Sequence, residues 1–157
     1  MSPKTPPGEK TVVSNRRAYH DFEILEKYEA GLKLTGAEVK SLRGGRGSLS
    51  EAYARVHGDE VWIEGMHIPP YEQAMDKHRY DPTRTRKLLL HRDEIERLLG
   101  KTAERGLTLV PLRVYFTHGL AKLELGLGKG RRRFEKRQAI AEREHKREME
   151  REVGRRR

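Results

Sequence analysis

The 157-residue sequence has no cysteine and little apolar material. Without Cys the chain has no disulfide framework, and the commonest structural zinc sites, which use Cys ligands, are excluded. Hydrophobic residues make up 34% of the chain, and no apolar run approaches the 18 or more residues that cross a bilayer. The first residues, MSPKTPPGEK, also lack the apolar stretch of a signal peptide. We therefore expect a cytoplasmic protein with no membrane partner.

Positive charge is in excess and is unevenly distributed. The chain has 34 Lys and Arg against 24 Asp and Glu, a formal net charge of +10. Residues 129–157 hold 13 basic and 6 acidic residues, so this segment carries most of the excess. A polyanion is the first candidate partner of such a chain.

Composition divides the chain into three parts. Residues 1–10 are rich in Pro, Gly and Lys and are expected to be a flexible lead. Residues 11–128 have enough apolar residues for a small core. Residues 129–157 are rich in helix formers but have no apolar stripe, which predicts a basic tail that is disordered when free and helical when bound to a polyanion.

Alternating and helical patterns fill the first half of residues 11–128, which we call the body. Residues 18–29 alternate in parity, which predicts a long half-buried strand that bends at Gly31. Thr35 and Glu38 have the spacing of a capping box, so we expect a short helix from there through Leu42. Two apolar runs, 52–56 and 61–66, flank Gly58-Asp59 and predict a hairpin.

The second half of the body has one helical pattern and one clear hairpin. Residues 88–99 have helical periodicity with Gly100 as a stop, and residues 102–105 predict a further helical turn. Residues 110–116 and 121–127 alternate on either side of a turn, and Pro111 indicates an edge or a bulge. The whole pattern predicts a mainly β fold, an OB-like antiparallel barrel with short flanking helices, although other small β barrels fit nearly as well.

Evidence for catalysis is weak. The seven His residues are scattered without the spacing of a metal site, and we expect no metal or other cofactor. Gly126 to Gly130, GLGKG, lacks the spacing of a dinucleotide loop and the Lys-Ser/Thr of a nucleotide-triphosphate loop. Glu29 and Glu38 could hold a divalent metal if they meet in space, which leaves a metal-dependent RNA hydrolase as a remote alternative.

Evidence for RNA binding is stronger. One basic run is Asn15-Arg16-Arg17, close to Tyr19, and another is the segment 81–87, DPTRTRK, close to Tyr80. Arg side chains bind phosphate in a bidentate manner and stack on bases, and Tyr also stacks on bases. A generic ribosomal or RNA-chaperone barrel is one interpretation of this combination.

Five ordered motifs make the interpretation more specific. They are NRRA (15–18), YEAGLKLTGAEVKSLRGG (28–45), DPTRTRKLLL (81–90), GLTLVPL (106–112) and LGKG-RRRFEKR (127–137). In these motifs the chain resembles the SsrA-binding protein (SmpB) family. The resemblance implies an OB fold and a non-enzymatic role. It also implies three partners: the tRNA-like domain of transfer-messenger RNA (tmRNA), the elongation factor that delivers aminoacyl-tRNA, and the stalled ribosome.

The same resemblance implies how the work is divided in trans-translation. The body supports aminoacylation of tmRNA and stands in for the anticodon arm that this RNA lacks. The tail occupies the empty decoding site and the mRNA channel as a helix.

The resemblance places RNA-binding positions on Asn15, Glu29 and Leu88. Charge and proximity to these motifs add five candidates, which are Arg16, Arg17, Arg84, Arg86 and Lys87. For Glu38 and its neighbours Val39 and Lys40 we expect a structural role first.

In the tail, the family commonly has an Asp-Lys-Arg triplet preceded by a His or another ring. Here the ring is Phe134, which can stack on a base but cannot donate a hydrogen bond, and Glu in place of Asp keeps the charge. Lys129 and Gly130 are expected to form the junction about which the tail pivots. The expected ribosome-binding residues are Lys129, Gly130, Arg131, Arg132, Arg133, Phe134, Glu135, Lys136 and Arg137.

Overall fold

The computed structural model describes residues 8–72, 79–104, 106–131, 145 and 147–151. No helix within these ranges is long and apolar enough to cross a membrane. The elements run in chain order as β1 (Glu9–Ser14), α1 (Arg16–Asp21), β2 (Phe22–Leu32), α2 (Gly36–Arg43), β3 (Tyr53–His57), β4 (Glu60–Glu64), β5 (Arg86–Leu89), α3 (Arg92–Thr102), β6 (Leu107–Thr117) and β7 (Leu120–Gly130).

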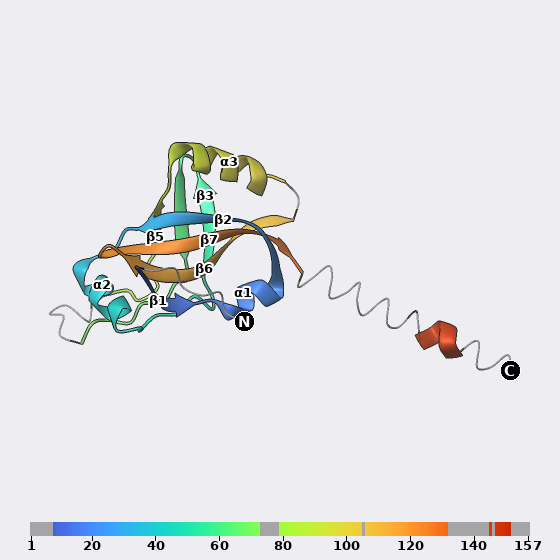
Figure 1. The fold of residues 1–157 in the computed structure, drawn as a ribbon, viewed down its shortest axis with the longest axis horizontal. Coiled ribbons are helices and arrows are strands. Elements are labelled where there is room, and N and C mark those ends of the chain that lie inside the picture. Colours follow the sequence, from blue (N-terminus) through green and yellow to red (C-terminus); the bar gives the residue numbers. More distant parts are fainter. Residues whose placement is uncertain (1–7, 73–78, 105, 132–144, 146, 152–157) are drawn as a thin grey trace.

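The strands form a closed antiparallel barrel with one strand added. Their order is β1-β6-β3-β4-β5-β2-β7, and a further pairing between β6 and β7 closes the ring. Strand β1 lies outside the ring and pairs with β6. In Figure 1, α3 lies above β3, whereas α1 and β1 lie on the opposite side of the barrel near β6. The predicted OB-like barrel with short flanking helices is confirmed.

The hairpin of β6 and β7 is the longest in the described fold, and its prediction is confirmed. Its turn, His118-Gly119, has positive φ at both residues, as a tight primed turn requires. The predicted irregularity at Pro111 is a bulge, because the register shifts between Pro111 and Arg113. The hairpin around Gly58, whose φ is +64°, is also confirmed, with the bounds of its strands β3 and β4 shifted by one or two residues from those predicted.

Two bulges divide the apolar residues between two cores. On β2 the register shifts between Ile24 and Glu26, and on β6 it shifts at Leu112. Each bulge moves the following residues to the other face of its strand. The main core therefore lies inside the barrel, and a small second cluster lies outside the sheet under α1. Its members are Ala18, Phe22, Ile24, Val110 and Leu112.

The glycines of GLGKG make room for this second cluster. A Cβ on Gly126 would lie 3.1 Å from Leu112 and 3.2 Å from Ile24, and one on Gly128 would lie 3.1 Å from Phe22. These contacts are tighter than ordinary packing. The segment is thus part of a β-strand whose small residues face α1.

The predicted strand over residues 18–29 is wrong at its start. Residues 16–21 form α1, and β2 begins at Phe22 and continues through Gly31 to Leu32. The helix forms because Ala18 packs on Val110 and Leu112, which are contributed by a distant strand. Gly31 continues the strand because it pairs with Leu89 on β5.

The predicted helix over residues 88–99 is also wrong at both ends. Leu88 and Leu89 belong to β5, because Leu88 pairs with Val61 and with Leu32. Helix α3 begins at Arg92 and continues past Gly100 to Thr102, whose Oγ1 donates to the carbonyl of Leu98 over 2.8 Å. Tertiary pairing outweighs local propensity at the first end.

The predicted segment boundaries need small corrections. Strand β1 begins at Glu9, inside the predicted flexible lead, because Glu9 and Lys10 pair with Thr117 and Phe116. Strand β7 continues to Gly130, two residues into the predicted tail. Of the tail beyond residue 131, the structure describes residues 145 and 147–151, which are helical and exposed.

Candidate nucleic-acid interface

A row of paired residues crosses the outer face of the barrel. Ser14 pairs with Arg113, Arg113 with Glu124, and Glu124 with Glu29. Directly opposed residues share a face of a sheet, and neighbouring strands lie about 4.8 Å apart. Ser14 and Glu29 are three strand-to-strand spacings apart, so the distance between them is roughly 14 Å. The row brings Asn15, which follows Ser14, and Glu29 to one surface, as RNA binding by both would require.

Arg113 holds the centre of the row. Its guanidinium donates to Glu124 over 3.1 Å and to Glu9 over 2.9 Å, and it lies over the ring of Tyr115 at 4.1 Å. Partial burial alone would lower the pKa of Arg113, but the two carboxylates outweigh burial and raise it. Arg113 is thus a fixed cation that orders the sheet surface between the two predicted RNA-binding positions.

Glu29 presents an accessible carboxylate. Its side chain is 54% exposed, and the Nζ atom of Lys122 lies 3.6 Å from Oε1. Burial, followed by hydrogen bonding to Glu29, raises the pKa of Tyr115. Glu29 is therefore positioned by two neighbours and keeps surface free to accept a hydrogen bond from a base edge.

Asn15 joins β1 to α1 and is held by the bulged strand. Its Nδ2 atom donates to the carbonyl of Pro111 over 2.8 Å, and its backbone N–H donates to the carbonyl of Leu112, also over 2.8 Å. The side chain makes no capping hydrogen bond to α1. These contacts fix the amide, whose oxygen accepts no hydrogen bond from the residues that the structure describes and so remains available as an acceptor.

Arg16 and Arg17 follow on the exposed side of α1. Neither makes an ion pair with any residue that the structure describes. The next residue, Ala18, is buried against β6 and anchors the helix. The structure thus brings Asn15, Arg16 and Arg17 together as predicted and leaves both cations available to phosphate.

The start of the tail lies against the same helix. Lys129 and Gly130 pair with Glu23 and Phe22 on β2, and the backbone N–H of Arg131 donates to the carbonyl of Asp21 at the end of α1 over 2.8 Å. Lys129 and Gly130 are therefore strand residues rather than the predicted pivot. The other predicted ribosome-binding residues, Arg132 to Arg137, lie outside the described residues.

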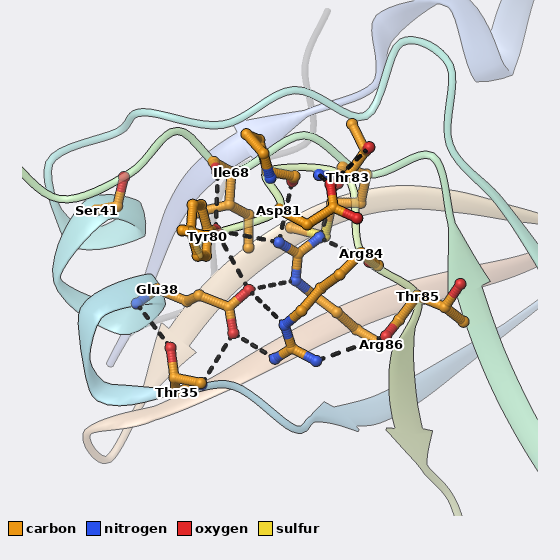
Figure 2. A network of polar contacts seen from close by, with 12 residues as sticks. Thr35, Glu38, Ser41, Ile68, Tyr80, Asp81, Thr83, Arg84, Thr85 and Arg86 are labelled. Carbon is orange, nitrogen blue, oxygen red and sulfur yellow. Dashed lines mark hydrogen bonds and ion pairs between the residues drawn. The ribbon is translucent and has the colours of Figure 1, made fainter. Parts of the chain in front are cut away.

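The second predicted basic run is largely committed to the interior. Figure 2 shows Glu38, on α2, between the guanidinium groups of Arg84 and Arg86. Glu38 Oε2 accepts from Arg86 Nε over 2.6 Å and from Arg84 Nε over 3.1 Å, while Oε1 accepts from Arg84 Nη2. Oε1 also accepts from the backbone N–H of Thr35 over 2.9 Å, which completes the predicted capping box.

Arg86 uses all five of its N–H groups within the protein. It is 0% exposed and donates to Glu38, to the hydroxyl of Tyr80, and to the carbonyls of Met66, Pro82 and Arg84. Its prediction as an RNA contact is therefore corrected: Arg86 fixes the segment 80–86 onto α2 (Figure 2). Arg84 is bidentate to Glu38 and keeps only the outer edge of its guanidinium for RNA.

Glu38 remains charged despite its burial. Burial raises its pKa, but hydrogen bonds from Arg84, the Thr35 backbone and Arg86 lower the pKa to about 2. The structural role expected for Glu38 is thus confirmed. Both of its oxygens are occupied, so it cannot pair with Glu29 to hold a metal, and the described residues contain no cluster of three or more potential metal ligands.

The prediction that Leu88 binds RNA is also corrected. It is 1% exposed and packs in the main core, so it cannot lie against a base. Its neighbour Leu89 is 51% exposed and pairs with Gly31, two residues along β2 from Glu29. Lys87 shares that outer face and contacts Glu60 at 3.3 Å. Leu89 is therefore the apolar side chain that the surface offers beside Glu29.

Sequence reasoning missed Leu89, Arg113 and Lys122. Alternation could have revealed Leu89 if residues 86–89 had been interpreted as a strand, because a buried Arg86 and Leu88 place Lys87 and Leu89 outside. Arg113 and Lys122 gave no such signal, since their importance depends on the register between β6, β7 and β2.

Comparisons with known proteins identify the family of the chain. The family model described as SmpB protein matches residues 12–155. An SsrA-binding protein of Salinispora arenicola is 56% identical over 149 residues, which cover 95% of this chain and 93% of that protein. One of Carboxydothermus hydrogenoformans is 54% identical over 142 residues, covering 90% and 95%.

A solved structure gives the same result. It is described as "tmRNA-SmpB: a journey to the center of the bacterial ribosome", and one of its chains aligns with a TM-score of 0.66 and 50% sequence identity, covering 81% of this chain and 92% of that one. With the family model matching nearly the whole chain, the protein belongs to the SmpB family.

Proposed function

We propose that this protein binds the tRNA-like domain of tmRNA and delivers it to stalled ribosomes for trans-translation. The observation that carries the proposal is the outer surface of the barrel, where Asn15 and Glu29 flank one row of paired residues and Arg16 and Arg17 remain unpaired among the described residues. The relatives named SsrA-binding protein and the structural neighbour described as tmRNA-SmpB support this partner.

The body and the tail have separate tasks in this proposal. Residues 1–128 carry a net charge of only +3, and the body within them selects its RNA through placed contacts, supporting aminoacylation of the bound tmRNA. The tail, with 13 basic and 6 acidic residues, enters the empty decoding site and the mRNA channel of a cytoplasmic ribosome. The elongation factor that carries aminoacyl-tRNA accompanies the complex.

The proposed role requires binding and no bond-breaking step. Glu38, one of the two carboxylates that a metal-dependent hydrolase would use, is bound by two Arg side chains. No catalytic residue is therefore assigned, and the protein acts as an adaptor.

Truncation after Arg131 tests the division of tasks. This cut keeps the ladder of β7 and the hydrogen bond from Arg131 to Asp21. We expect the truncated protein to bind the tRNA-like domain nearly as tightly as the full chain and to lose tagging on ribosomes stalled in vitro. Equal loss of RNA binding and tagging would contradict the proposed division.

Recovery of bound RNA tests the partner itself. The full chain, carrying an affinity tag, is purified from cells and its RNA is sequenced. One dominant species with a tRNA-like domain is expected. A diffuse mixture of RNAs would instead identify a generic RNA chaperone.

A further inference from the structure

Tyr19 is an exposed aromatic side chain on the helix that carries Arg16 and Arg17. It lies on α1 next to the buried Ala18 and is 44% exposed. The Nζ atom of Lys27, on β2, lies over its ring at 5.4 Å from the centroid. With 44% of the residue exposed, part of Tyr19 remains accessible to a ligand beside that cation.

Its surroundings connect the two parts of the surface. Lys27 pairs with Gly126 on the outer face of the sheet, and Glu29 follows two residues later on the same face. Arg16 and Arg17 lie on the same helix as Tyr19. Tyr19 therefore shares a helix with the Arg pair and contacts, through Lys27, the strand that carries Glu29.

The charge beside the ring favours a polyanion. The second exposed tyrosine of the barrel, Tyr53, is 53% exposed but has an acidic partner, because its hydrogen bond with Glu64 raises its pKa. Tyr19 has Lys27 in the corresponding place and two further cations on its own helix. An RNA phosphate is attracted to the cations around Tyr19, whereas at Tyr53 the nearby cation, Arg55, is already paired with Glu64 at 3.1 Å.

We infer that Tyr19 stacks on an unpaired base of the bound RNA while Lys27, Arg16 and Arg17 contact the phosphates on either side. Proteins recognise structured RNA largely at such splayed bases, and an aromatic ring accepts any base because every base has a flat face. The inference rests on the proposed function and adds to it a contact with a looped-out nucleotide rather than with a helix backbone.

The test compares substitutions of the two tyrosines in the full chain. Binding of a tRNA-like domain transcript is measured at several salt concentrations for Y19A, Y19L, Y19F and the matched control Y53A. We expect Y19A and Y19L to weaken binding by about 5- to 150-fold, Y19F to stay within about twofold of the wild type, and Y53A to have no effect. Thermal unfolding should be unchanged for all four, because both rings are exposed.

The salt dependence separates stacking from phosphate contact. In the Y19A protein the affinity should fall at every salt concentration with the slope of log K against log[salt] unchanged, since no phosphate contact is lost. Wild-type affinity of Y19A, or a loss in Y19F equal to that in Y19A, would overturn the stacking role while the proposed function stands. If the wild-type protein showed no preference for this RNA, both the proposed function and the stacking role of Tyr19 would be overturned.

Discussion

Two groups of arginines in this protein have the same chemistry and opposite surroundings. Arg84 and Arg86 are bound to Glu38 in the interior, and Arg86 has no N–H group left for a ligand. Arg16 and Arg17 lie exposed on α1 and make no ion pair with the described residues. A basic motif in the sequence therefore does not tell whether its charge serves the fold or a partner. What decides is the presence of a carboxylate that the fold brings to it.

The largest effect is expected from breaking the buried network. Glu38→Gln leaves Arg86 buried without its counter-charge, and removal of one partner of such a pair costs about 3–5 kcal/mol. The free energy of unfolding, measured with urea, should fall by that amount. Glu29→Gln removes the same charge from an exposed site and should change stability by less than about 0.5 kcal/mol. Equal losses would show that the buried network has no special weight.

The same network predicts a pH dependence. The pKa of Glu38 is lowered from 4.5 to about 2 in the folded state, so its contribution to stability is complete above the unfolded value. As the pH falls from about 4.5 towards 2, that contribution is lost. The stability difference between the wild type and Glu38→Gln should therefore narrow across this window. A constant difference down to pH 2 would contradict the role of the Glu38 charge.

These two arginine groups also show what could be predicted. The capping box of Thr35 and Glu38 and the β6–β7 hairpin follow from local spacing, and both are confirmed. The burial of Arg86 does not, because the carbonyls of Met66 and Pro82 and the carboxylate of Glu38 reach it only in the folded chain. The motif DPTRTRK resembles an RNA-binding run for the same reason that it suits an ion-pair network: it concentrates Arg.

The prediction of a strand over residues 18–29 is wrong at its start for a related reason, because residues 16–21 form α1. Ala18 on α1 and Phe22 and Ile24 on β2 have the parity of one strand, yet they belong to the outer cluster that covers β6 and β7. No single strand pattern indicates that a sheet has a second core on its outside. Part of the candidate site was nevertheless found, since Asn15, Arg16, Arg17 and Glu29 lie on one surface.

A smaller effect is expected from the exposed arginines. The double substitution R16A/R17A should leave the unfolding midpoint unchanged, because neither side chain has a partner among the described residues. Binding of the tRNA-like domain should weaken, and the salt slope should fall by about 0.7 to 0.9 per lost phosphate contact. Arg55→Ala, on β3 beside Glu64, is the matched control and should leave the slope unchanged. An unchanged slope in R16A/R17A would remove these residues from the interface.

The smallest effect is expected at an ion pair that combines features of both groups. Arg97, on α3, lies 2.5 Å from Glu26 and is exposed, and hydrogen bonds from Arg97 and Tyr28 lower the pKa of Glu26 to about 2. Glu26 and Glu38 therefore share a similarly low pKa but differ in burial. Arg97→Met should change the urea midpoint far less than Glu38→Gln, because solvent screens the exposed pair. Equal shifts would show that pKa alone, without burial, measures the contribution of a charge to stability.

The two ladders of β7 have a mechanical consequence. The strand pairs with β2 on one side and with β6 on the other up to its last residues, and the tail leaves it directly after Arg131 is bonded to Asp21. Ladder hydrogen bonds run perpendicular to the strands. A force applied along β7 to the chain that follows Arg131 therefore loads both ladders in shear, so that many bonds share the force instead of opening one after another. Tension on the tail is transmitted to the barrel and to α1 without first unpeeling the strand from which the tail emerges.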